Sequence, residues 1–263
     1  MPKVKVNGID IYYEVHGQGY PVVFLHGFSA THQMWEPQMP VLSGGYRFII
    51  YDARGHGQSE SPPSVEDYSA DIVVEDLYQL LGTLGIQNMV LGGLSMGGYQ
   101  SLRFFLTHPE MVTALILMDT GPGYRNPAHR EEWNRSREKL AHRLEAEGIE
   151  VLAADAPTET GREIMLQQNP VGLAHMVRKV VAQHDSWVMD NLGEIKVPTL
   201  VLVGENDTPF HAAASYMART IPAAEYVVVP DAGHAANIDN TEAFNQVVLG
   251  FLKKLDLTQA EAR

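Results

Sequence analysis

The sequence predicts an α/β protein with a mainly parallel, doubly wound sheet. Short continuous apolar runs, which are typical of strands buried on both faces, alternate with longer segments of helical periodicity. Such alternation implies right-handed crossovers between parallel strands. The polar and glycine-rich residues that follow these runs are then expected at one edge of the sheet, where open α/β sheets place their ligands.

The individual elements follow from the patterns in chain order. Residues 4–6 and 9–15 alternate around Asn7-Gly8, a dipeptide typical of hairpin turns, so an antiparallel pair is expected to open the chain. Later apolar runs predict strands, and apolar spacings of three and four residues predict helices. The expected strands are 21–25, 47–51, 89–91, 112–118, 199–203 and 225–229, and the expected helices are 71–84, 99–108, 208–219 and a closing helix capped by Asp239 or Asn240.

The alternation of strands and helices is interrupted after Gly121. Residues 125–148 are charged and helix-prone, and Asn169-Pro170 is typical of an N-cap followed by proline at the first helical position. No strand pattern occurs for about 70 residues, which is too long for an unstructured loop in a compact domain. We therefore expect a helical cap over residues 122–193, inserted between two parts of an α/β core, residues 1–121 and 194–263.

Composition limits the classes of function. A chain of 263 residues with 45% hydrophobic residues can bury a sizeable core, and its net charge of -13 argues against nucleic acid and anionic membranes as partners. It contains no cysteine, no metal-binding spacing among its 11 histidines, and no apolar run approaching a membrane span. The first residues lack the apolar core of a signal peptide. We therefore expect a cytoplasmic protein that acts on a small molecule without a metal or other cofactor.

The residues 93–97, Gly-Leu-Ser-Met-Gly, carry the clearest chemical signal. They lie between an apolar run and a helical pattern, which is the context of a nucleophile elbow, so Ser95 is the candidate nucleophile. A serine hydroxyl needs a base that is itself oriented by an acid. His234 follows the last strand and Asp207 closes the strand before it, in the expected chain order. Asp119 ends another strand and is the competing acid, but the Gly-x-x-Asp turn that ends in Asp207 favours Asp207.

The backbone N–H groups of Phe28 and Met96 are the candidate oxyanion-hole donors. Met96 follows the nucleophile, and Phe28 lies in the loop after the first parallel strand, where such sites take their second donor. The neighbouring His26 is interpreted as a loop-stabilising residue. The turn around His56 lacks the remaining residues of a phosphate-binding loop, so phosphate binding is not expected there.

Together these motifs resemble those of α/β-hydrolases in the single-chain esterase and lactonase group. The resemblance covers nearly the whole chain and implies Ser-His-Asp chemistry, with carboxylesterases, enol-lactonases, cofactor-free perhydrolases and C–C bond hydrolases as neighbours. Because the elbow carries a serine and not an aspartate, dehalogenase and epoxide hydrolase chemistry is not expected. The resemblance treats Asp52, Arg54 and their glycines as structural. It is carried by His26-Gly27-Phe28, Asp52-x-Arg54-Gly55-x-Gly57-x-Ser59, residues 93–97, Gly204-x-x-Asp207 and Gly233-His234.

We therefore predict a carboxylesterase-like serine hydrolase that cleaves small, neutral carboxylic esters through an acyl-enzyme on Ser95. Lactone hydrolysis, C–C bond hydrolysis or perhydrolysis by the same triad are the enzymatic alternatives, and a weakly catalytic ligand receptor on the same fold is the alternative outside enzymes. The cap is expected to lie over Ser95 and to build an apolar pocket that favours short neutral chains. Its expected lining residues are Trp133, Leu140, Met176, Val180 and Trp187.

Overall fold

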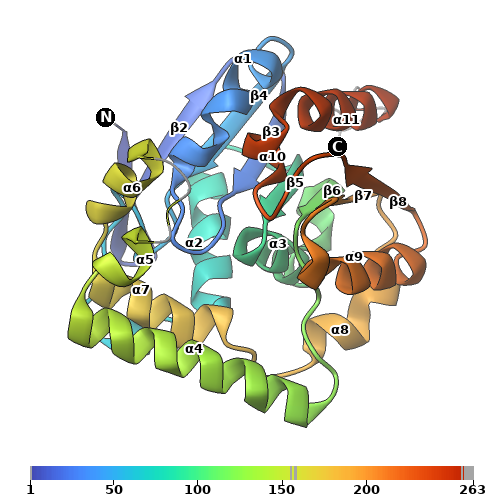
Figure 1. The fold of residues 1–263 in the computed structure, drawn as a ribbon. Coiled ribbons are helices and arrows are strands. Elements are labelled where there is room, and N and C mark those ends of the chain that lie inside the picture. The colour runs from blue at the N-terminus through green and yellow to red at the C-terminus, as the bar shows by residue number, and fades with distance from the viewer. Residues whose placement is uncertain (1, 155, 157–158, 256, 258–263) are drawn as a thin grey trace.

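The computed structural model describes residues 2–154, 156, 159–255 and 257, and these form one eight-stranded sheet flanked by helices (Figure 1). The strand order is β1-β2-β4-β3-β5-β6-β7-β8. β2 pairs antiparallel with both β1 and β4, and every other pair is parallel, so the predicted fold class is confirmed. The strands are β1 Lys3–Val6, β2 Ile9–His16, β3 Tyr20–Leu25, β4 Tyr46–Tyr51, β5 Met89–Leu94, β6 Val112–Met118, β7 Thr199–Gly204 and β8 Ala224–Val229.

The N-terminal hairpin forms at the predicted turn. Asn7 and Gly8 have φ values of 46° and 84°, as a type I′ turn requires at both central positions. The Asn7 side chain also donates a 2.9 Å hydrogen bond to Asp76 in α2 (Ala70–Thr83). This bond fixes the hairpin against the body of the protein.

Helices cover both faces of the sheet because successive strand side chains point to opposite faces. In β3, Val23 and Leu25 join one apolar cluster, while Val22 and Phe24 join the other. The first cluster packs under α2, α3 (Met96–Thr107) and α9 (Thr208–Thr220). The second packs under η1 (His32–Gln38), α1 (Met39–Leu42), α10 (Ala236–Asp239) and α11 (Thr241–Lys254). Two further short helices, η2 (Val65–Asp67) and η3 (Pro109–Met111), lie in connections.

Every regular element described between β6 and β7 is a helix. We call the helices of this segment the cap helices, and in Figure 1 α4 crosses below the sheet while α5 and α6 rise at its side. Asn169 caps α7 by accepting hydrogen bonds from the N–H groups of Val171 and Gly172. The cap helices have an apolar cluster of their own, which includes Ala141, Leu144, Leu173, Ala174 and Val177. They are α4 Pro127–Glu147, α5 Glu150–Ala153, α6 Glu159–Leu166, α7 Pro170–Met176, η4 Val177–Val181, α8 Trp187–Asn191 and η5 Leu192–Glu194.

The segment of η1 and α1 was not apparent from the sequence. Its two prolines, Pro37 inside the 3₁₀ turn and Pro40 in the first turn of α1, are unfavourable inside a longer helix, so no helix was expected here. In the structure Thr31 caps this turn and Trp35 is fully buried, with its ring centroid 5.0 Å from that of Phe24. A single large aromatic side chain therefore anchors the segment to the sheet.

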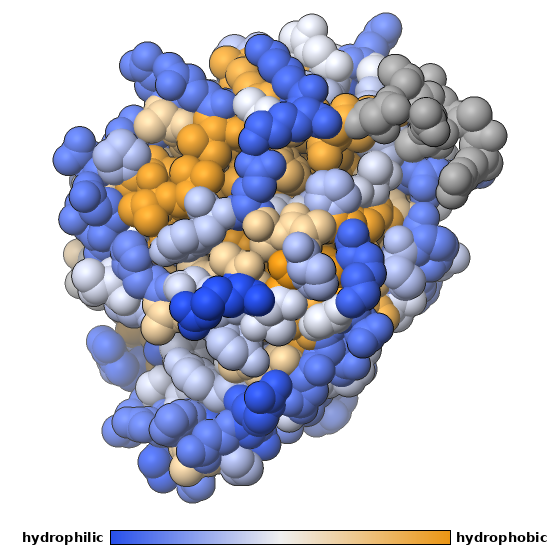
Figure 2. Space-filling model, turned by 90° about the vertical axis from the view of Figure 1, so that its right-hand side faces the viewer, coloured by the Kyte–Doolittle hydropathy of each residue, from blue (hydrophilic) through white to orange (hydrophobic). Residues whose placement is uncertain are grey.

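The surface mixes charged and apolar residues. Figure 2 shows the side of the molecule on which β8, α9 and α11 lie in Figure 1, with apolar patches between hydrophilic side chains. β8 is an edge strand and exposes Tyr226 and Val228. Within the described residues, no helix combines the length and the apolar character that a membrane crossing would need.

Candidate active site

Ser95 occupies a strained turn between β5 and α3. Its φ of 54° and ψ of -113° lie outside the regions that a serine ordinarily adopts, at a cost of about 1–3 kcal/mol. Glycines make the turn possible, because a Cβ at Gly97 would lie 2.3 Å from the carbonyl oxygen of Leu25. The turn is fixed by two hydrogen bonds, from the Ser95 N–H to Met118 (2.9 Å) and from the Thr120 hydroxyl to the Ser95 carbonyl (2.6 Å). The half-buried Ser95 thus stands directly before the N-terminus of α3, where partial positive charge favours an anion.

Four candidate residues follow the carboxyl ends of four neighbouring strands. Ser95, Asp119, Asp207 and His234 come after β5, β6, β7 and β8, which are adjacent in the sheet. Because these strands are parallel, their carboxyl ends lie at one edge, and the four residues share it.

Asp207 and His234 form a direct hydrogen bond. The distance from His234 Nδ1 to Asp207 Oδ2 is 2.8 Å, with the Asp207 side chain buried and that of His234 45% exposed. Burial lowers the pKa of His234, but the hydrogen bond to Asp207 and its negative charge outweigh burial, so the net pKa is raised above 6.5. A bond at Nδ1 leaves Nε2 as the proton acceptor of the neutral ring, which is the state a general base needs.

Asp119 has a different environment, although it reaches the same edge. It is fully buried, and its two oxygens accept hydrogen bonds from the N–H groups of Gly204 (2.7 Å) and Ala236 (3.4 Å). Burial raises the pKa of Asp119 from 3.8 to about 7. These backbone groups flank Asp207 and His234, so Asp119 links the two loops that carry them.

The loop after β3 lies beside the elbow. A Cβ at Gly27 would be 3.2 Å from the Leu94 side chain and 3.7 Å from the Ser95 Cβ, so the backbone before Phe28 passes close to the serine. Phe28 itself is half-buried and packs against both the core cluster and the cluster of the cap helices. Met96 is the first residue of α3, a position whose N–H has no partner within its own helix. The loop that carries Phe28 thus passes beside the elbow, and Met96 directly follows its serine.

Comparison with known proteins identifies the family of this fold. Residues 20–190 match the family model described as the alpha/beta hydrolase fold. The chain belongs to the α/β-hydrolase family. A putative 2-succinyl-6-hydroxy-2,4-cyclohexadiene-1-carboxylate synthase of Bacillus subtilis is 29% identical, with 89% of this chain and 90% of that protein covered.

Solved structures of esterases and lactonases share the whole architecture. A thermophilic esterase from Thermogutta terrifontis (malate bound) is 32% identical and superposes with a TM-score of 0.87, covering 97% of this chain and 99% of that one. The enol-lactonase of Burkholderia xenovorans is 29% identical, with a TM-score of 0.85 over 96% of this chain and 100% of that one. The hydrolase fold is thus present over nearly its full length.

Buried polar contacts hold the loop after β4 in place at the sheet edge of this hydrolase. Asp52 is fully buried and accepts hydrogen bonds from the backbone and the Nδ1 of His32 (2.7 and 2.8 Å) and from the N–H of Gln58. Burial raises the pKa of Asp52, but the hydrogen bond from His32 and neighbouring histidines outweigh it, and the net pKa is lowered. Arg54 forms a buried two-pronged pair with Asp76 (2.8 and 2.6 Å). These contacts match the structural interpretation of Asp52 and Arg54.

His26 also links loops and stands apart from the acid–base pair. It is buried, its Nε2 accepts a 2.9 Å hydrogen bond from the N–H of Ala53, and burial lowers its pKa. This ring therefore joins the loop after β3 to the loop after β4. The contacts match the interpretation of His26 as loop-stabilising.

The five expected cap residues are placed differently from one another. Met176 and Val180 are completely or almost completely covered, at 0% and 2% exposure, within the main core cluster. Their packing leaves no surface for a substrate, which corrects the expectation that they line a pocket. Leu140 is partly buried against the cap cluster that also contacts Phe28.

The two tryptophans are held by arginines and a carbonyl group. Trp133 donates a 2.9 Å hydrogen bond to the Val181 carbonyl, and the Arg137 guanidinium lies 4.3 Å from its ring centroid. Trp187 is 37% exposed and has Arg103 over its ring at 5.0 Å. Trp187 therefore packs on the outer surface of α3, contrary to the expected inward orientation.

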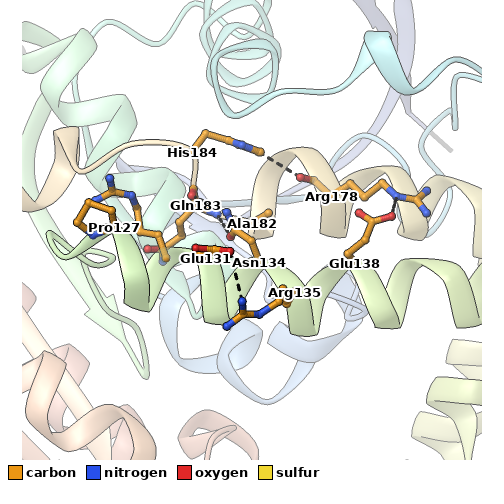
Figure 3. A pocket seen from close by; sticks show the side chains of 10 residues that line it. Pro127, Glu131, Asn134, Arg135, Glu138, Arg178, Ala182, Gln183 and His184 are labelled. Carbon is orange, nitrogen blue, oxygen red and sulfur yellow. Dashed lines mark hydrogen bonds and ion pairs between the residues drawn. The ribbon is translucent and has the colours of Figure 1, made fainter.

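A polar surface hollow of about 480 Å³ lies on the cap helices (Figure 3). Its wall contains three arginines, but Arg178 is paired with Glu138 and Arg135 with Glu131, as the dashed lines show. None of the candidate catalytic residues lines it. Among the described residues, no group of three histidine or acidic side chains is arranged to hold a metal ion.

Sequence reasoning missed two residues beside the acid–base pair and the elbow. The Phe210 ring centroid lies 4.7 Å from that of His234, one helical turn after Asp207. Gln168, in the cap, is buried and forms hydrogen bonds with the backbone of Ser29 and Gly57, the residues that directly follow Phe28 and His56. The position of Phe210, three residues after Asp207, could have indicated it from the sequence. A single glutamine between two helices, such as Gln168, gives no such indication.

Proposed function

We propose that this α/β-hydrolase cleaves small, neutral carboxylic esters through an acyl-enzyme on Ser95. The observation that carries the proposal is the 2.8 Å bond between His234 and Asp207 at the same sheet edge as a serine in a strained elbow. Backbone strain at a partly exposed serine between a strand and a helix is the pattern expected of a nucleophile held ready for substrate.

The proposed reaction uses each residue at a stated atom. Ser95 Oγ attacks the carbonyl carbon of the ester as its proton passes to His234 Nε2, and Asp207 stabilises the resulting imidazolium through Nδ1. The negative oxygen of the tetrahedral intermediate is stabilised by the N–H groups of Phe28 and Met96. His234 then returns the proton to the leaving alcohol as the carbon–oxygen bond breaks. A water molecule, deprotonated by His234, repeats the sequence and releases the acid and free Ser95.

Charge and apolar surface favour a neutral acyl group. The chain carries a net charge of -13, and the carboxylate of Asp207 lies buried against His234, so an anionic substrate would be repelled. The partly exposed rings of Phe28 and Phe210 offer apolar surface next to the elbow and to His234. Such surface stabilises short alkyl or aryl groups at about 25 cal/mol per Å².

Lactone hydrolysis is the second candidate, favoured by the full-length likeness to an enol-lactonase structure. A lactone is an ester whose alcohol remains attached, so the same residues perform the same steps. The two substrates differ in the leaving group: the alcohol of an open ester departs, whereas that of a lactone stays attached to the acyl-enzyme and can close the ring again. Comparing ring-closed and open esters of equal size distinguishes the candidates.

The test begins with Ser95→Ala. Its kcat for p-nitrophenyl butyrate should fall by about four to six orders of magnitude, as when the nucleophile is removed from comparable sites. Ser136→Ala, which removes an exposed hydroxyl on α4, is the matched control and should retain full activity. Mass spectrometry after treatment with an organophosphonate should find the adduct on Ser95. An adduct on another residue, or undiminished turnover by the Ser95 variant, would refute the assignment.

A further inference from the structure

We propose that Gln168 of the cap is a positioning residue that holds the oxyanion-hole loop in its catalytic shape. The inference rests on the proposed function and adds to it a residue that touches no substrate. Gln168 lies between α6 and α7 and is 4% exposed. Its side chain reaches from the cap into the core, where it makes two hydrogen bonds to backbone groups.

Both ends of the Gln168 amide are engaged. Nε2 donates to the carbonyl oxygen of Ser29 at 2.6 Å, and Oε1 accepts from the N–H of Gly57 at 3.3 Å. One partner is an acceptor and the other a donor, so the orientation of the amide is fixed. The side chain thereby joins the loop after β3 to the loop after β4 at the residue that follows Phe28.

Ser29 needs such support because its backbone is strained. It is the third residue of a turn closed by the hydrogen bond from Ala30 to Gly27 (3.2 Å), and its φ is 62°. A positive φ at this position is required by type II turns, which place glycine or asparagine there, and a serine adopts it at an energetic cost. Without external bonds the turn would relax, which would displace Phe28, the residue before Ser29 in the turn, together with its N–H group.

His56 supplies the second external bond. Its Nε2 accepts the N–H of Ser29 at 3.2 Å, so its proton is on Nδ1, which donates to the Arg54 carbonyl at 3.2 Å. Burial lowers the pKa of His56 to about 3, and the neutral ring keeps its acceptor at working pH. Its ring also meets that of Phe28 edge-on at 5.8 Å. Gln168 and His56 thus hold the carbonyl and the N–H of the same strained residue.

The geometry therefore couples the cap to the chemical step. An oxyanion donor contributes only if it is aimed at the position where charge develops, and losing one such donor costs about 10²–10³ in kcat. Loosening the turn misplaces the Phe28 donor only in part, so a smaller loss is expected. Substrate binding before the reaction should change little, because Gln168 lies behind the loop.

The central variants are Gln168→Met, which keeps the volume but removes both hydrogen bonds, and Gln168→Glu. The carboxylate of the second variant can still accept from Gly57 but cannot donate to Ser29. Gln167→Met is the matched control, because the adjacent Gln167 side chain is exposed. All three are assayed with p-nitrophenyl butyrate at pH 8, after thermal unfolding has shown that each is folded.

We expect both Gln168 variants to lose about 10- to 100-fold in kcat, with KM changed by less than about threefold. A trifluoromethyl ketone, which forms a tetrahedral oxyanion adduct with Ser95, should bind more weakly by the same factor, whereas the matching methyl ketone should bind as before. Adding Ser29→Gly to Gln168→Met should restore part of the lost kcat, because glycine adopts the positive φ without strain.

Three results would overturn the inference: a folded Gln168→Glu with wild-type kcat, equal weakening of both ketones, or no recovery in the double variant. These outcomes are distinct from a failure of the proposed function. That failure would appear in the unsubstituted enzyme, as absence of ester turnover or as turnover that survives Ser95→Ala.

Discussion

Replacing Asp207 by asparagine is the most direct test of the acid–base assignment. In the structure Asp207 is 5% exposed and accepts the Nδ1 proton of His234 at 2.8 Å. Asparagine has nearly the same shape, so it keeps the packing. Its NH₂ group can donate to Nδ1 and so favour the tautomer whose Nε2 carries the proton, and such a ring cannot accept a proton from Ser95.

The expected fall in kcat/KM of Asp207→Asn has two causes. A histidine held in the wrong tautomer lowers kcat by about 10⁴ in a comparable serine enzyme, and the lost carboxylate no longer stabilises the imidazolium. We therefore expect kcat/KM of Asp207→Asn to fall by about 10³–10⁴. Asp119→Asn retains one acceptor for the N–H of Gly204 and should lose less than about tenfold, since it would disturb the His234 loop only indirectly.

The assay compares the two variants with p-nitrophenyl acetate and butyrate at pH 8. Thermal unfolding monitored by circular dichroism serves as the folding control, and the affinity for a methyl ketone substrate analogue shows whether the pocket is intact. If Asp119→Asn is the more damaged of the two folded variants, the acid has been assigned to the wrong strand end. Near-wild-type kcat in Asp207→Asn would refute the role of the pair altogether.

Three further outcomes are expected. The kcat/KM of the unsubstituted enzyme should rise with pH through an apparent pKa above 6.5, because Asp207 raises the pKa of His234 and only the neutral ring accepts a proton; a flat profile from pH 5 to 8 would contradict this. The raised pKa of Asp119 means that the folded state holds a proton which the unfolded state releases near 3.8, so this group's contribution to stability falls as pH rises from about 4 to about 7. Urea unfolding should therefore show Asp119→Asn gaining about 3 kcal/mol relative to the unsubstituted protein between pH 5 and pH 8, and a constant difference would refute it. Leu140 packs against the same cap cluster as Phe28, and we expect it to border the acyl group of the substrate. Leu140→Ala should therefore raise the butyrate-to-acetate ratio of kcat/KM about tenfold, while Trp187→Ala should leave this ratio unchanged. The reverse result would place the acyl group elsewhere.

The strands, and the polar residues that follow them, were predictable from the sequence because each is marked by a strong local pattern. The expected strand 112–118 matches β6, and the Asn7-Gly8 turn and the Asn169 cap form as predicted, since each depends on residues adjacent in sequence. The sheet edge follows from parallel topology alone. Asp207 and His234 both follow strands of this sheet, so they were expected at the same edge, and in the structure they form a hydrogen bond.

The cap was predictable as helical but not in its packing. Apolar spacing indicates which side chains are buried, but it does not say whether they face a partner helix or a cavity. Met176 and Val180 satisfy their helical period by packing into the core, and Trp187 does so against Arg103. Gln168 contacts the site loops through two backbone partners far away in sequence. No pattern of neighbouring residues could have indicated it.

The distribution of backbone strain links the fold to the site. Five non-glycine residues in the described chain have positive φ, namely Asn7, Ser29, Ser95, Asp119 and Asp231. Asn7 belongs to the hairpin, and the other four follow β3, β5, β6 and β8 at the carboxyl edge of the parallel sheet. Strained residues persist only where the surroundings over-determine them.

At this edge, hydrogen bonds from other segments hold three of these strained residues in place. The elbow is held by Met118 and Thr120, the turn at Ser29 by Gln168 and His56, and the backbone around Asp119 by a hydrogen bond from its N–H to Leu202 (2.9 Å). In each case the supporting group comes from a different strand, loop or cap segment. The buried sheet therefore stabilises an arrangement that no single loop would adopt alone, and the proposed nucleophile and the proposed oxyanion-hole loop are both held by such bonds from outside their own turns.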